Sequence, residues 1–225
     1  MRPPITLSTR GSPELLSILI AAGWPVVPLL RCSVIALALV IERFLSLRES
    51  RVAPARLVDE VLTVARTAVP PADTINKLAD NSILGLVLAQ GLRAAAAEPR
   101  ISEGNLRAAF ESAGRDAVHR LERNLSALGT IASAAPLLGL LGTVVGMIEI
   151  FGASGATGGA GGNPAELAHG ISVALYNTAF GLIVAIPSLI AYRHFRTRIE
   201  DHTLTLEQAA DRMVPHLLRL GSSRR

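Results

Sequence analysis

Two long apolar stretches in the second half of the chain constrain its fold more than any other feature. They run from about Leu125 to Phe151 and from about Leu167 to Ala191, and each is long enough to cross a bilayer as a single helix. Neither stretch carries an ionisable group at mid-depth. If protons move along these helices, the titrating group has to come from a second protein, so we expect a subunit of a larger complex.

The composition supports an integral membrane protein. Apolar residues make up 50% of the 225 residues and charged residues only 18%. The net charge of +4 does not indicate nucleic-acid binding, because aromatic residues are only 4% and no basic run is interleaved with them. The single cysteine, Cys32, excludes an intrachain disulfide and a thiolate metal site. We expect no metal and no other cofactor.

A third apolar stretch, residues 26–47, reaches the roughly 20 residues that a crossing needs. We expect it to be retained and not cleaved as a signal peptide. The N-terminal segment before it, residues 1–25, contains an apolar piece at 15–22 that is too short to cross and is expected to lie on the membrane surface. Arg31 stands near the start of the span, where its side chain either reaches the outer head groups or contacts a partner or lipid.

Arginines near the span ends predict the orientation, because they resist translocation. The glycine-rich loop at 152–166 has no Lys or Arg, so it is expected in the periplasm, together with the N-terminus. Residues 48–124 and 192–225 are then cytoplasmic helical regions. The predicted fold is an all-α integral membrane protein with three transmembrane helices (26–47, 125–151 and 167–191), the N-terminus outside and long cytoplasmic helical extensions.

The cytoplasmic region has apolar residues at helical spacing. One helix is expected from about Leu57 to Ala65 and a second over residues 73–97. Ser102 is a good N-cap for a third, whose apolar periodicity continues through residue 125 with no proline before the span. We therefore expect an unbroken helix over 102–151. These extensions are expected to pack against one another and against copies of the same chain.

A hydroxyl set among small residues occurs once in each of the last two spans. Thr143 and Thr178 are expected at similar depth, where they could line a shared cavity, order water or hydrogen-bond an entering carboxylate. The alternative is structural, because a threonine hydroxyl in a membrane helix can bond the carbonyl one turn back.

Small residues mark close helix contacts in a membrane. Ala174, Thr178, Gly181 and Ala185 fall within about 60° on one face of the third span, and we expect them to line a pore or face a partner. In the second span we expect helix packing by Gly142, Gly146 and Pro136. The polar residues of that span, Ser133 and Thr130 among them, form no continuous stripe with Thr143.

Two further features bear on function. Glu149 and His169 are expected near the outer interface, where they either are simply solvated or form an outer proton entrance. The string Gly152-Ala-Ser-Gly155 matches the motif of intramembrane serine proteases. However, Ser154 lies in a glycine-rich loop between two spans, which cannot hold a nucleophile rigidly. We therefore expect no enzyme activity and no catalytic residues.

At these motifs the chain resembles the MotA/TolQ/ExbB proton channel family, and its ExbB and TolQ branches more than the four-span MotA branch. The resemblance covers residues 23 to about 198. It is carried by Cys32-Ser-Val-Ile-Ala-Leu with Ile41-Glu-Arg43, by Ala135-Pro-Leu-Leu-Gly-Leu-Leu-Gly-Thr-Val-Val-Gly-Met147, and by Gly170-Ile-Ser, Thr178-Ala-Phe-Gly-Leu and Ala185-Ile-Pro-Ser-Leu-Ile-Ala-Tyr192.

The resemblance implies a homopentamer in the bacterial inner membrane around an ExbD-like single-span partner. In it Thr143 and Thr178 face the partner's membrane aspartate. The complex would then use proton motive force to act on a TonB-like protein, which would energise transport at the outer membrane. Many relatives have a glutamate where this chain has Val173, which removes a proton relay at that position. A TolQ-like subunit of the Tol-Pal envelope system and a non-conducting membrane scaffold remain the alternatives.

Overall fold

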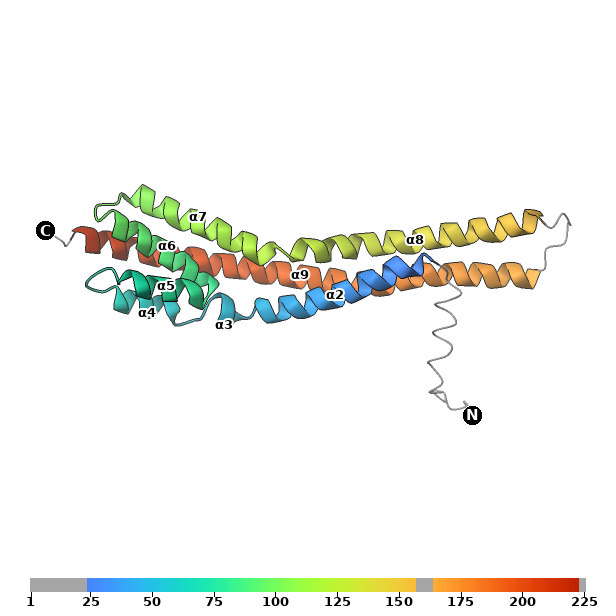
Figure 1. Cartoon of the computed structure of the whole chain (residues 1–225), viewed down its shortest axis with the longest axis horizontal. Coiled ribbons are helices and arrows are strands. Elements are labelled where there is room, and N and C mark those ends of the chain that lie inside the picture. The colour runs from blue at the N-terminus through green and yellow to red at the C-terminus, as the bar shows by residue number, and fades with distance from the viewer. Residues whose placement is uncertain (1–23, 157–163, 223–225) are drawn as a thin grey trace, which may run out of the picture. The chain divides into compact units, whose positions relative to one another are not determined.

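The computed structural model describes the backbone of residues 24–156 and 164–222 (Figure 1). Within these ranges it also describes the side chains, except those of residues 153–167 and 169. Every regular element in these ranges is a helix. The predicted surface helix at 15–22 and part of the glycine-rich loop lie outside the described residues. The helices are α2 (Val26–Ser46), α3 (Glu49–Val52), α4 (Leu57–Val64), α5 (Ala72–Asn81), α6 (Ile83–Ala97), α7 (Glu103–Glu122), α8 (Leu125–Ala156) and α9 (Pro164–Ser222).

Two of these helices are long and apolar enough to cross a membrane. They are Leu125–Gly152 within α8 and Gly170–Ser222 within α9, whose most apolar 18-residue windows have mean hydropathies of 2.0 and 1.8. Only 28% of each window is buried. The core helix of a soluble protein would be mostly buried, so this exposure favours lipid contact. The helix α2 is also apolar, but Arg31, Glu42 and Arg43 interrupt it.

The chain divides into two compact units, and the first comprises residues up to 38 together with 127–191. Its core is small: Leu29 of α2, Ala135 of α8 and Ala185 of α9 are buried together, with Leu138, Phe180 and Val184 packed around them. Most of the remaining large side chains of α8 and α9 in this unit are exposed. They are Leu137, Leu140, Leu141, Val144, Ile148, Phe151, Leu175, Tyr176, Leu182, Ile183, Ile186, Leu189 and Ile190.

The second unit comprises residues 39–126 and 192–225 and has a conventional core. The last part of α9 contributes a row of buried residues at intervals of three and four, which is the pattern of a helix packed along one face. This row is Phe195, Ile199, His202, Leu206, Ala209 and Met213. The aromatic ring of Phe110 in α7 fills the space where a side chain on Gly91 of α6 would lie. The two helices thus approach closely at this point.

Serine hydroxyls cap two helices of the second unit. The hydroxyl of Ser102 accepts a hydrogen bond from the Asn105 amide at 3.2 Å, so the predicted N-cap of α7 is confirmed. The predicted single helix over 73–97 is wrong, because Ser82 is extended and separates α5 from α6. The Ser82 hydroxyl caps α6 by accepting from the Gly85 amide at 3.0 Å.

The predicted unbroken helix over 102–151 is also wrong. The helix α7 ends at Glu122 and α8 begins at Leu125, with a turn at 123–124. In the last turn of α7 the Leu121 carbonyl accepts a hydrogen bond from Arg43, a tertiary contact that periodicity in the sequence does not reveal. Pro136, by contrast, lies inside α8 without ending it.

Candidate functional site

The two apolar helices of the first unit meet along matching rows of small residues. On α8 the row comprises Ala135, Gly139, Gly142 and Gly146, and on α9 it comprises Ala174, Thr178, Gly181 and Ala185. Both rows have intervals of four, three and four residues, which keeps each row on one face of its helix. The helices run antiparallel, since Gly181 lies over Ala135 and Gly146 lies over Ala174.

Glycine is required for this contact. A Cβ atom on Gly139 would lie 2.8 Å from the Asn177 carbonyl oxygen, and one on Gly181 would lie 2.7 Å from the Ala135 carbonyl oxygen. A Cβ atom on Gly142 would lie 2.7 Å from the Cβ atom of Asn177. At Gly139 and Gly181 backbone therefore packs on backbone, the close approach that small residues permit between membrane helices.

Three residues predicted to line a pore lie within this chain's own packing. Ala174 and Ala185 are 2% and 4% exposed, and Gly181 is buried as well. In the structure these residues are covered by α8, and Ala185 is also covered by Leu29 of α2. Their role toward a partner stays a prediction, and the two threonines are the members of the set whose side chains are only half-buried.

Thr143 and Thr178 lie at nearby levels of the helix pair, offset by about 3 Å along its axis. Gly142 meets Asn177, and because the helices are antiparallel, the two threonines stand one residue away from that contact in opposite directions. Both also lie on the same flank. On the other flank, Leu138 of α8 and Val184 of α9 pack toward Leu29. Leu138 stands about 140° from Thr143 around the α8 axis, and Val184 stands about 120° from Thr178 around the α9 axis. The two hydroxyls therefore border the side of the α8–α9 pair that α2 does not cover.

The two hydroxyls differ in their hydrogen bonds. The Thr143 hydroxyl donates to the Leu140 carbonyl at 2.7 Å, the local bond expected of a threonine in a membrane helix. The Thr178 hydroxyl makes no hydrogen bond to any described residue. It can therefore donate to or accept from a group that enters this flank.

The remaining predicted site residues fall in separate places. Gly142 and Gly146 contact α9, whereas Pro136 is half-buried within α8. Glu149 is exposed, and the side chain of His169 lies outside the described residues. Their joint role as an outer proton entrance stays a prediction.

Sequence reasoning missed three residues of the α8–α9 contact: Ala135, Gly139 and Asn177. A signal for the first two was present, because the small residues of the second span repeat the four-three-four intervals of the third. Asn177 is only 2% exposed and packs against Gly142. A polar side chain next to a row of glycines gave no sequence signal for that contact.

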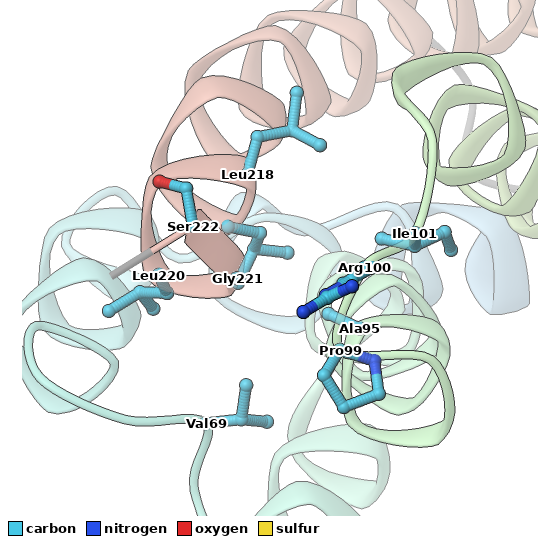
Figure 2. Close-up of a pocket in the computed structure, with 10 residues that line it drawn as sticks. Val69, Ala95, Pro99, Arg100, Ile101, Leu218, Leu220, Gly221 and Ser222 are labelled. Carbon is cyan, nitrogen blue, oxygen red and sulfur yellow. The ribbon is translucent and has the colours of Figure 1, made fainter. Parts of the chain in front are cut away.

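A cavity in the second unit carries no catalytic set. Figure 2 shows this cavity, of about 390 Å³, between the α6–α7 loop and the end of α9. Arg100 is the one charged residue among the described residues that line it, and Val69, Pro99 and Leu220 are typical of the rest. Within the described residues no group of three or more His, Cys, Asp or Glu side chains is arranged to hold a metal ion.

Comparison with known proteins agrees with the resemblance carried by these motifs. The family described as the MotA/TolQ/ExbB proton channel family matches residues 79–208. A Synechocystis protein named putative biopolymer transport protein ExbB-like 3 is 35% identical over 179 residues, which cover 79% of this chain and 82% of that protein. With the apolar, largely exposed helices α8 and α9, these matches identify a membrane protein. The chain belongs to the MotA/TolQ/ExbB proton channel family.

Proposed function

We propose that this chain is an ExbB-like proton-channel subunit of an energy-transducing complex in the bacterial inner membrane. Family membership and the relative named as a biopolymer transport protein support a role in proton-coupled transport. The proposed complex contains five copies of this chain around an ExbD-like single-span partner, and it has no enzymatic activity. It uses proton motive force to act on a TonB-like protein, which energises transport at the outer membrane.

The proposed topology has three spans, with α2 as the first. An unbroken stripe of large apolar side chains on α2 is exposed, as expected for a helix that faces lipid: Val27, Leu30, Val34, Leu37 and Ile41. The intervals of three and four residues place them on one face. Arg31 is exposed near the start of this helix, within reach of the outer head groups.

The proposed orientation places the N-terminus and the α8–α9 connection in the periplasm. Arg48 and Arg51 follow α2, Arg120 and Arg123 precede α8, and residues 152–166, which include the connection between α8 and α9, contain no Lys or Arg. Positively charged residues near span ends are enriched on the cytoplasmic side. The second unit, with its charged helices, is then cytoplasmic.

The observation that carries the proposal is the pairing of Thr143 with Thr178 on one uncovered flank of the α8–α9 pair. A hydroxyl does not titrate near neutral pH, so these groups cannot store a proton. They can hydrogen-bond a carboxylate that does titrate, and a partner helix lying against this flank would bring one. With Val173 on α9 in place of an acidic residue, the partner has to supply the carboxylate.

Two other functions would use the same fold. A TolQ-like subunit would have the same proton site but would serve the Tol-Pal envelope system, so only its partners and cargo differ. A non-conducting scaffold would use the small-residue rows purely for packing, and the hydrogen bond from Thr143 to Leu140 fits that role.

Replacing the threonine hydroxyls tests the proposal. Thr178→Val keeps the branched shape and removes the hydroxyl, so we expect loss of proton-dependent transport with an intact complex by native mass spectrometry. Thr130→Val is the matched control, because Thr130 is exposed and stands about 220° around α8 from Thr143. Unchanged transport in Thr178→Val and Thr143→Val, with the complex intact, would support the scaffold instead.

A further inference from the structure

No proline or glycine accounts for the break between α7 and α8. Between Ala117 and Ala127 there is no proline and no glycine, and the apolar periodicity continues through it. Sharp kinks in helices otherwise arise where a side chain or water enters the backbone ladder. Asn124 immediately precedes α8 and is of a residue type favoured at helix N-termini, but its side-chain amide donates to Glu42 of α2.

A side chain does reach the ladder at this point. Arg43 of α2 donates from Nη1 to the Leu121 carbonyl at 2.7 Å. In an unbroken helix that carbonyl would accept from the Leu125 amide, four residues on. Arg43 thus bonds a carbonyl one turn before the residue at which α8 begins.

The guanidinium of Arg43 is held firmly. Its Nε and Nη2 donate to the two carboxylate oxygens of Glu42 at 2.6 and 2.7 Å, and Arg43 is only 5% exposed. A buried charge is stabilised when it is paired and hydrogen-bonded, and three of the guanidinium N–H groups of Arg43 have acceptors, two on Glu42 and one at Leu121. Glu42 also accepts from the Asn124 side chain at 3.2 Å. Leu121 and Asn124, which flank residues 122–123, are therefore both hydrogen-bonded to the Glu42–Arg43 pair of α2.

We propose that Arg43 is a positioning residue that keeps α7 and α8 apart, with Glu42 holding its guanidinium in place. The break falls where a helix rich in charge gives way to the apolar helix α8. Arg43 thereby sets the residue at which the apolar helix begins. This inference goes beyond the proposed function, because a scaffold would need the same start of α8 as a channel.

Hydrogen exchange at the break distinguishes this role from a merely structural one. In the full-length protein in lipid nanodiscs, we expect Arg43→Leu to let the two helices join. The amides of residues 123–128 should then exchange about tenfold more slowly, because they enter a helix ladder. A variant that only loosened the protein would exchange faster. Faster or unchanged exchange at these amides would overturn the proposal.

Further variants separate Arg43 from its surroundings. Arg43→Lys keeps a donor for Leu121 and should exchange as the unmodified protein does. Glu42→Gln, a milder change should Arg43→Leu fail to fold, should slow exchange in the same direction but less. Arg107→Leu is the matched control in α7, since Arg107 bonds Glu103 and Asp211 away from the break. If Asn124→Ala alone slowed exchange as much as Arg43→Leu, the break would have a local cause and the proposal would fail.

Discussion

Gly139 of α8 and Gly181 of α9 face each other so closely that a Cβ atom on either would meet the other's backbone. A Cβ atom on Gly139 would lie 3.2 Å from the Gly181 Cα atom, and one on Gly181 would lie 3.0 Å from the Gly139 Cα atom. Few atoms can move to relieve such a contact, because backbone cannot rotate away as a side chain can. The pair thus sets the spacing of the two apolar helices.

Adding a methyl group at either position should separate the helices. We expect Gly139→Ala and Gly181→Ala each to lower the free energy of unfolding by about 1–3 kcal/mol, the usual cost of overpacking a close contact. Reversible unfolding in detergent micelles or bicelles measures this difference.

Two glycines of α7 provide the control for that measurement. A Cβ atom on Gly104 or on Gly114 would have no heavy atom within 4 Å beyond its own helix backbone and chain neighbours. Alanine there should raise stability by about 0.5–1 kcal/mol, because glycine is unfavourable within a helix. If the α8 and α9 variants behaved like these, the close packing of Gly139 on Gly181 would be refuted.

The contact of Gly142 with Asn177 predicts a rescue. A Cβ atom on Gly142 would lie 2.7 Å from the Cβ atom, 2.8 Å from the Cγ atom and 3.0 Å from the Nδ2 atom of Asn177. Gly142→Ala should therefore destabilise the pair, and Asn177→Gly in the same chain should recover part of the loss by removing all three atoms. A double-mutant cycle on unfolding free energy should give a favourable coupling energy of about 0.5–3 kcal/mol. Additive effects would show that the two residues do not touch.

Helix periodicity predicted much of the fold, and tertiary contacts account for most of what it missed. The long helices, the N-cap at Ser102 and the small-residue face of α9 all depend on residues close together in the chain. The break after Glu122 depends instead on Arg43, which is 78 residues from Leu121 in sequence. No periodic pattern in α7 or α8 contains that information.

At the candidate site, too, features local to one helix could be predicted, whereas contacts between helices could not. Spacing along each helix was enough to select Thr143 and Thr178 as a pair. It could not show that Ala174 and Ala185 are buried by the same chain, because burial depends on how α8 and α9 align. The register of the two helices becomes evident only from the contacts between their small residues.

A second close contact, in the other unit, predicts a similar rescue. The ring of Phe110 occupies the position of a side chain on Gly91, and Phe110 is only 3% exposed. Gly91→Ala should lower stability by about 1–3 kcal/mol through overpacking. Phe110→Leu puts a smaller side chain at this point, so it should cost less when combined with Gly91→Ala than when introduced alone. Chemical denaturation of the two single variants, the double variant and the unmodified protein checks the sign, and an equal cost of Phe110→Leu in both backgrounds would contradict it.

Two histidines of α9 bond carbonyls in the N-terminal part of the second unit, and they differ in burial. The Nε2 atom of His202 lies 3.1 Å from the Leu47 carbonyl oxygen, and that of His216 lies 2.9 Å from the Ala65 carbonyl oxygen. His202 is 6% exposed, whereas His216 is only partly buried. Removing a hydrogen-bond donor from a buried carbonyl costs about 1–3 kcal/mol. We therefore expect His202→Ala to destabilise the protein more than His216→Ala, as measured by chemical denaturation.

A donor of similar reach should separate hydrogen bonding from packing at position 202. His202→Gln retains an amide N–H group that can reach the Leu47 carbonyl, whereas His202→Leu fills the space without a donor. If the hydrogen bond matters, the glutamine variant should unfold at a higher denaturant concentration than the leucine variant. If packing alone held this part of α9 in place, leucine would be the more stable of the two, because it buries more apolar surface and carries no unsatisfied polar group.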